Sequence, residues 1–425
     1  MFILSGQKRN NMRKIFQYLG IEKTGWLELI LALYPILAGY SYGSFHLSIV
    51  ILLFLDVAIF FTRKREPLKC LPLVVFFLFV LFHDSIMFFI LPDIPSYFKN
   101  SFISNVIFAV SVYVIAPQID YRKFRSALYI VAIVCMIGMI YHVLLLAAGK
   151  SISPIKVPLM PDMKEAARLY AVMDRPTSFF WEPQSYASFM MIPLFMALIE
   201  RKTSLAFIIS ILMIASTSTT GIILSILMFF IATIYNRGKW YTVLGGILGV
   251  FLLVYFLNTS TFASVGLDKF LNTEVEESGR ISNGYYIATQ LDYADLITGI
   301  PYANTQDAYE ASYFESLGSK GVLTSENVFY VSAIWIALIQ YGIFGLFLFV
   351  LPYFWIYKKN KRILPFLLCV LIAHFSNPDF IGAAYFFQLI FMLTFIRSNI
   401  DGNNIDGNNI NNIKYANSNP YIPVC

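Results

Sequence analysis

The sequence predicts an all-α polytopic membrane protein with about twelve transmembrane helices and one large loop outside the membrane. Of its 425 residues, 58% are hydrophobic and 13% are charged, whereas about a quarter of the residues in soluble proteins are charged. Apolar windows long enough to cross a hydrocarbon core of about 30 Å recur along nearly the whole chain. An acidic, Tyr-rich stretch from Thr259 to Glu326 interrupts them. Such a polar insertion favours an enzyme that holds its substrate at the membrane surface.

The polytopic membrane domain is predicted to cover residues 1–397. In chain order, the predicted spans are 26–43, 45–62, 68–91, 101–117, 127–148, 183–200, 203–217, 219–235, 241–258, 343–357, 363–376 and 380–397. A spanning helix needs about 20 apolar residues, so the shorter spans in this set are the least secure. The first apolar run begins only near Trp26, and no small-residue cleavage site follows it, so no cleavable signal peptide is predicted.

Lys and Arg gather in the short connections, and connections of this kind stay in the cytoplasm. The basic clusters are Lys8-Arg9 with Arg13-Lys14, Arg63-Lys64-Arg65, Arg122-Lys123 with Arg125, Arg201-Lys202, Arg237 with Lys239, and Lys358-Lys359 with Lys361-Arg362. They predict that both termini lie in the cytoplasm and that the outer loops are 149–182 and 259–342. Orientation signals also account for the net charge of +6, so no nucleic-acid partner is expected.

The last basic cluster decides how residues 327–341 are interpreted. If they formed a full span, Lys358–Arg362 would lie outside. We therefore expect 327–341 to be a helix at the outer interface, with the span starting at the break between Gly342 and Gly345. The alternative is thirteen spans with one cluster that violates the charge rule.

The chain ends in an Asn-rich segment, residues 398–425, that repeats Asn-Ile-Asp-Gly-Asn before it degenerates. Such a segment buries too little apolar surface to offset the entropy of ordering it, so a disordered cytoplasmic tail is predicted. The four cysteines show no metal-binding spacing and no pair in an exterior loop, which indicates neither a metal site nor a disulfide.

The outer loop 149–182 contains an amphipathic stretch, from Pro161 to Met173, whose polar side includes the candidate substrate-binding residue Arg168. The loop then leads through Arg175 to Glu182, directly before the span at 183. Ionisable groups at this depth are costly and usually face a water-filled cavity or a partner. The alternative is an Arg175–Glu182 ion pair that only anchors the helix.

The large outer loop contains ten acidic residues and one arginine, Arg280. Because so many carboxylates surround it, Arg280 can instead form an ion pair that only stabilises the loop. The loop aromatics, including Tyr285 and Tyr286, can stack on sugar rings. Alternatively, they can form the core of the loop itself, because a small domain must bury apolar surface to be stable.

Arg175 and Arg280 together suggest a chemistry. Guanidinium groups present planar, always-charged donors that match phosphate oxygens. Two of them at the outer boundary can stabilise a lipid-linked diphosphate as a leaving group, and attack on the attached sugar then requires a base for the acceptor hydroxyl. His374 and Asp379 lie in the turn between the last two spans, which the topology places outside, so this turn is a further candidate to line the site.

Several segments of the second half of the chain follow one another in a recognisable order. They are Arg175-Pro-Thr-Ser-Phe-Phe-Trp-Glu-Pro-Gln-Ser-Tyr-Ala; Ser216-Thr-Ser-Thr-Thr-Gly; Gly279-Arg280 with Gly284-Tyr-Tyr and Leu296-Ile-Thr-Gly299-Ile-Pro; Glu326-Asn327-Val-Phe-Tyr330 with Tyr341-Gly342-Ile-Phe-Gly345; and His374 to Asp379. In order, spacing and predicted sidedness, residues 170–397 resemble the bacterial O-antigen polymerase and O-antigen ligase superfamily.

The resemblance implies a C-type glycosyltransferase-like fold that uses undecaprenyl diphosphate-linked glycans without a metal ion or other cofactor. It assigns Asn327 and Tyr330 to the substrate site. Where the ligases and many relatives have a histidine, this chain has Glu326. That carboxylate can act as the base, because a partly buried carboxylate can have a raised pKa, or the position is not catalytic here.

The expected function is the polymerisation of lipid-linked oligosaccharide repeats into O-antigen or into capsular or exopolysaccharide, at the outer face of the membrane. The missing histidine favours a polymerase over a ligase that moves finished glycan to another acceptor. A flippase or exporter for the same repeats is the alternative of a different class; it predicts inverted repeats and charged residues in mid-membrane. Besides the bilayer and the lipid-linked substrate, a chain-length regulator and a flippase are the expected partners.

Overall fold

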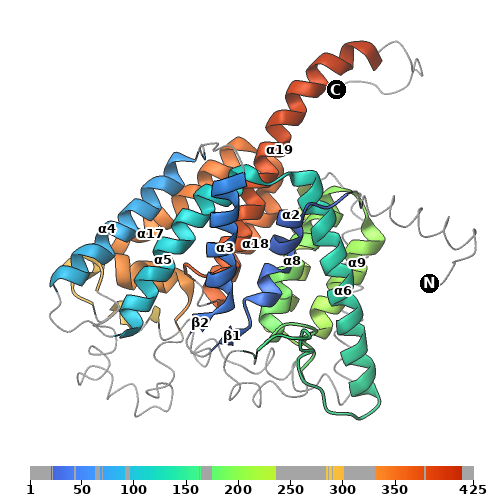
Figure 1. The fold of residues 1–425 in the computed structure, drawn as a ribbon, viewed down its shortest axis with the longest axis horizontal. Helices are drawn as coiled ribbons and strands as arrows, with labels where there is room; N and C mark the ends of the chain where they lie inside the picture. Colours follow the sequence, from blue (N-terminus) through green and yellow to red (C-terminus); the bar gives the residue numbers. More distant parts are fainter. Residues whose placement is uncertain are drawn as a thin grey trace, which may run out of the picture.

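The computed structural model describes residues 21, 23–42, 45–62, 68, 70–90, 96–161, 163, 175–235, 284–285, 287–289, 291–300, 331–377 and 380–413. In these residues the chain is mostly helical, and the helices form a bundle (Figure 1). The helices are α2 (Trp26–Leu37), α3 (Leu47–Thr62), α4 (Leu71–Ile90), α5 (Ser96–Ile115), α6 (Tyr121–Ala147), α8 (Pro183–Ile199), α9 (Thr203–Ala215), α10 (Thr219–Tyr235), α14 (Tyr293–Thr298), α17 (Ala333–Lys359), α18 (Leu364–Ser376) and α19 (Ala383–Ile413), with the 3-10 turns η1 (Ala116–Gln118) and η3 (Lys361–Ile363).

The helices coincide with the predicted spans. A described helix lies in each of them except 241–258, which is outside the described residues. By length and composition, α6 and α17 are the two described helices that suffice to cross a membrane, and eight further described helices are apolar but shorter. The mostly helical fold is therefore established, and the number of about twelve spans stays a prediction.

The predicted break in the tenth span is present. Helix α17 is interrupted at Gly342, whose φ of 65° and ψ of −171° are not helical. The short helix α14 from the large loop packs on this break, and the N–H of Ile300 donates to the carbonyl of Ile339 at 2.7 Å. Gly299, with φ of 83°, faces the break so closely that a Cβ there would collide with the backbone of Gln340.

Helix α8 is the core of the bundle. All its residues from Tyr186 to Leu198 are buried, and α6, α9, α10, α18 and α19 pack around it. A helix that is apolar all round is expected to be buried in this way. Glu182 directly precedes α8, and Arg175 lies eight residues before its first residue.

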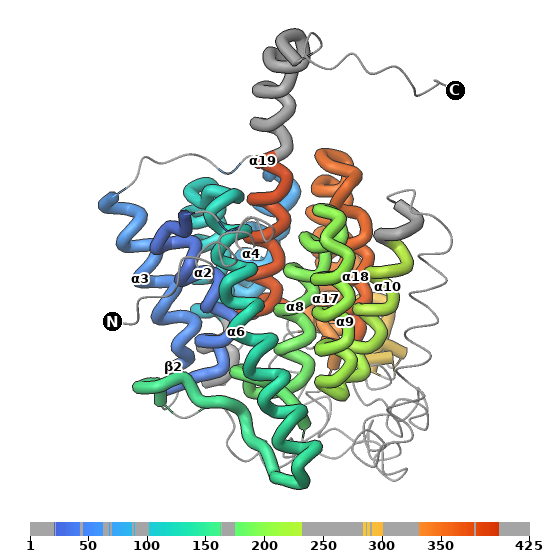
Figure 2. The backbone as a smooth tube through the Cα atoms, turned by 90° about the vertical axis from the view of Figure 1, so that its right-hand side faces the viewer, coloured from blue at the N-terminus to red at the C-terminus, as the bar shows by residue number. Residues whose placement is uncertain are grey.

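One end of the bundle, which we call the hairpin end, contains the short antiparallel pair β1 (Ser41–Tyr42) and β2 (Phe45–His46). After α6, the chain runs along the same end (the green segment below the helices in Figure 2). There the N–H of Val157 donates to the hydroxyl of Tyr40 at 2.8 Å, and Met163 forms a bridge with Tyr40.

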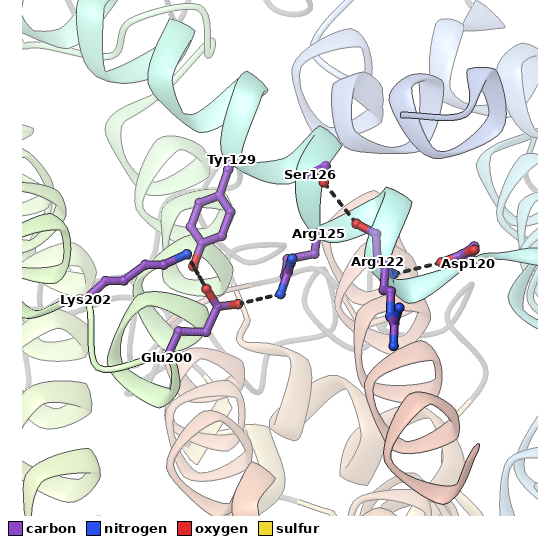
Figure 3. A network of polar contacts seen from close by, with 7 residues as sticks. All are labelled: Asp120, Arg122, Arg125, Ser126, Tyr129, Glu200 and Lys202. Carbon is purple, nitrogen blue, oxygen red and sulfur yellow. Dashed lines mark hydrogen bonds and ion pairs between the residues drawn. The ribbon is translucent and has the colours of Figure 1, made fainter. Parts of the chain in front are cut away.

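The opposite end, which we call the basic end, contains the connections before α6, between α8 and α9, and between α17 and α18. Figure 3 shows the contacts that tie the first two together. Glu200 pairs with Arg125 at 3.5 Å and with Lys202, and it accepts from the hydroxyl of Tyr129 at 3.2 Å. Asp120 caps α6. The acidic Glu200 thus offsets part of the positive charge and joins three helices.

The last described helix reaches into the Asn-rich segment. Helix α19 continues to Ile413 and projects from the basic end (Figure 1), and the disordered tail stays a prediction. Once a helix is nucleated, each further residue adds a hydrogen bond at little extra cost, which lets a polar segment continue an apolar helix. Residues 414–425 lie outside the described residues.

Candidate functional site

Arg175 is held at the hairpin end, between the start of α8 and the turn that joins α9 to α10. Its Nε donates to the Thr217 hydroxyl at 3.2 Å, and its Nη2 donates to the Thr217 carbonyl at 2.7 Å. Thr217 has a φ of 56°, which turns the chain sharply and aims its carbonyl at the guanidinium. Two bonds to one residue fix the orientation of the partly buried guanidinium plane.

The electrostatic surroundings of Arg175 suit an anion. Burial lowers the pKa of Arg175, and the negative charge of Glu182 acts in the opposite direction. Helices α8 and α10 both begin beside it, at Pro183 and Thr219. A helix N-terminus carries a partial positive charge and unpaired N–H groups, so the arginine and the two helix starts add to the same positive potential.

Glu182 is the described carboxylate nearest in the chain to this arginine. It is the N-terminal flanking residue of α8, and the Ser185 hydroxyl donates to its Oε1 at 3.2 Å. A carboxylate is an acceptor on both of its oxygens and can take a proton from a substrate hydroxyl. Glu182 thus keeps its predicted place in the site, next to Arg175.

Polar side chains tie the helix ends around this site together. Gln184 Nε2 donates to the Ser376 carbonyl at 3.2 Å, and the Thr220 hydroxyl donates to the Ser376 hydroxyl at 3.2 Å. The N–H of Ala333, the first residue of α17, donates to the Asn377 carbonyl at 2.8 Å. The starts of α8, α10 and α17 therefore meet the end of α18.

His374, a candidate to line the site, lies inside the bundle. The side chain is buried, and its Nε2 lies 2.7 Å from the Tyr353 hydroxyl. Its ring packs at 5.1 Å from the ring of Phe349 and at 5.9 Å from that of Tyr385. Because His374 lies in the last turn of α18, the helix directs it inward to these aromatic rings.

Tyr285 remains compatible with a surface role. It is 55% exposed, and its ring contacts Trp335 edge-on at 6.3 Å between centroids. This contact, with that of α14, holds described parts of the large loop against α17. The other predicted site residues lie outside the described residues: Arg168, Arg280, Tyr286, Glu326, Asn327, Tyr330 and Asp379.

Sequence reasoning missed the partners that position Arg175. The segment that begins at Ser216 contributes to the family resemblance, but nothing in the sequence linked Thr217 to an arginine 42 residues earlier. His142 was not among the candidate residues, yet it binds the backbone just after Arg175. A single sequence reveals periodic and local patterns, whereas these contacts join residues that are far apart in the chain.

Comparison with known proteins finds no family model and no curated protein that matches this chain. The class of protein is therefore inferred from its own sequence and structure. The part of the chain that the structure describes is a mostly helical bundle in which two helices are suited to crossing a membrane. One end of this bundle holds a fixed arginine beside a carboxylate and two helix N-termini.

Proposed function

We propose that this chain is a bacterial membrane glycosyltransferase that polymerises undecaprenyl diphosphate-linked oligosaccharide repeats at the outer face of the cytoplasmic membrane. The observation that carries the proposal is Arg175, held by Thr217 between the starts of α8 and α10 with Glu182 beside it. The ordered motifs between residues 170 and 397 supply the substrate class by their resemblance to O-antigen polymerases and ligases.

The surface of the bundle supports a membrane location. Large apolar side chains are exposed along α3, α4, α6 and α17; they include Phe54, Phe61, Phe82, Phe89, Ile137, Leu144, Phe344 and Phe347. A soluble monomer rarely exposes contiguous apolar area on this scale, and lipid tails would cover it. The basic end then faces the cytoplasm and the hairpin end faces outward, in accordance with the positive-inside rule.

The proposed step is a displacement at the anomeric carbon of a lipid-linked sugar. The acceptor hydroxyl forms the new glycosidic bond, and the bond from the anomeric carbon to the diphosphate oxygen breaks. The electron pair leaves with undecaprenyl diphosphate, where Arg175, Arg280 and the two helix starts stabilise its charge. The hydroxyl proton passes to a carboxylate, Glu182 or Glu326.

The test is to replace Arg175 by Ala and by Lys, and to score polymer length in a strain that lacks the chromosomal copy. Loss of a charge-stabilising donor typically reduces the rate by about 100-fold to 1000-fold, so Arg175→Ala should leave only unpolymerised repeats. Lys should restore part of the activity, because it keeps the positive charge but lacks the planar, bidentate donors of the guanidinium group. Arg280→Ala is expected to behave like Arg175→Ala.

Arg122→Ala is the matched control. It also removes an arginine, but at the basic end, where the side chain is exposed and points away from Glu200 (Figure 3). It should make polymer of normal length. Long polymer in both the Arg175→Ala and Arg280→Ala strains, with normal membrane levels of protein, would remove the diphosphate-binding proposal.

An exporter of the same lipid-linked repeats is the second candidate, since exporters are expected to have charged residues between their helices. Asp84 in α4 is buried, and its Oδ2 accepts from Asn105 Nδ2 at 3.1 Å and from the Tyr341 hydroxyl at 3.3 Å. Asp56 in α3 is a further helix carboxylate. In a deletion strain, repeats that stay on the inner leaflet would favour the exporter; repeats that reach the outer leaflet unpolymerised would favour the polymerase.

A further inference from the structure

His142 lies near the end of α6, and its side chain is buried against the segment that follows Arg175. The backbone N–H groups of Thr177 and Ser178 both donate to its Nδ1, each at 3.3 Å. The ring also hydrogen-bonds to the backbone of Ser153. An Nδ1 that accepts cannot carry a proton, so the imidazole here is neutral and its proton is on Nε2.

The turn that His142 binds needs support from outside. Ser178 has a φ of 58°, which non-glycine residues adopt rarely. Both Thr177 and Ser178 are fully buried, so no water can satisfy their N–H groups. The Ser178 hydroxyl donates to the Cys135 carbonyl at 2.8 Å, and the Ser178 carbonyl accepts from Ile155 at 2.9 Å.

These contacts attach the turn to α6 on one side and to the loop after α6 on the other. Arg175 lies two residues before the pair of N–H groups, and Glu182 lies four residues after Ser178. The direction in which the chain leaves the turn therefore decides whether the Arg175 guanidinium meets Thr217. Among the described residues, His142 is the side chain that accepts both of these N–H bonds.

We propose that His142 is a positioning residue of the transferase site, whose neutral Nδ1 holds the Thr177–Ser178 turn so that Arg175 stays aimed at the diphosphate. The inference rests on the proposed function for its link to activity. It does not make His142 a catalytic residue, because its Nδ1 accepts from two backbone N–H groups and its ring also hydrogen-bonds to the backbone of Ser153.

A matched pair of substitutions separates this role from plain packing. In His142→Asn, the side-chain oxygen sits where Nδ1 was and can accept from the two N–H groups. In His142→Gln, the longer side chain carries its amide to the position of Nε2 and leaves the N–H groups without that acceptor. Gln is the better helix former and is closer to His in size, so a packing role predicts that Gln is tolerated at least as well as Asn.

Two measurements are made on each variant of the full chain: polymer formation in the deletion strain, and hydrogen exchange of the 177–178 amides in protein reconstituted in lipid. The loss of two hydrogen bonds of ordinary net strength corresponds to about tenfold or more. We expect Gln to exchange at least about tenfold faster and to lose polymer to a similar degree, while Asn stays close to the parent in both. Equal behaviour of Asn and Gln in both measurements would overturn the proposal.

Failure of this inference can be told apart from failure of the proposed function. Amide exchange does not depend on which reaction the protein catalyses, so it decides whether His142 holds the turn even if Arg175→Ala still makes polymer. If Arg175→Ala is inactive and His142→Gln is fully active with fast amide exchange, the proposed function stands and the positioning role is refuted.

Discussion

Replacement of Gly299 by Ala should detach α14 from the break in α17. Gly299 has φ of 83° and ψ of 158°, a region that is essentially restricted to glycine. A side chain there costs about 1–3 kcal/mol. The added Cβ would also collide with the backbone of Gln340, which must move and break the bond from Ile300 to Ile339, at a further cost of about 1 kcal/mol.

The sum, about 2–4 kcal/mol, shifts the equilibrium between docked and undocked α14 by about 30-fold to 1000-fold. Hydrogen exchange of the Ile300 amide, measured in the reconstituted protein, reports this equilibrium directly. Gly149→Ala is the control: its φ is 68° but no atom lies within 4 Å of the added Cβ. It should leave Ile300 unchanged. If Gly299→Ala also leaves Ile300 exchange unchanged, the packing of α14 on α17 is not what protects this amide.

Three further predictions follow from the sequence and the fold. If Glu326 is the base, Glu326→Gln should lose nearly all polymerisation while Glu326→Asp retains some; parental activity of Gln would make the residue structural. Cysteines placed at Lys359 and Asn304, in a background without native cysteines, should respond oppositely to a membrane-impermeant thiol reagent, and labelling of both from outside would support thirteen spans. Tyr353→Phe should destabilise the fold by about 1–3 kcal/mol, because the buried His374 nitrogen loses its partner. Polymer formation per folded molecule should not change, and a loss at normal stability would return His374 to the site.

The helix positions could be predicted because a run of apolar residues marks both the place and the length of a helix that is removed from water. The break at Gly342 could also be predicted, since a glycine pair in an apolar run marks a place where the helix cannot continue regularly. The inward direction of His374 could not, because it depends on which face of a short helix meets Tyr353. The same applies to Arg175: its approximate depth followed from the span at 183, but the contact with Thr217 depends on how three helices pack.

The burial of α8 has a consequence for how the chain is made. Helices emerge from the ribosome in order, and α8 is complete long before α18 and α19, which cover two of its faces. Until these arrive, the apolar sides of α8 must be shielded by lipid or by the insertion machinery. The bond from Gln184 to Ser376 likewise waits for the C-terminal helices. A nascent or truncated chain therefore lacks this contact at the start of α8, and under the proposed function it would become active only when synthesis is nearly complete.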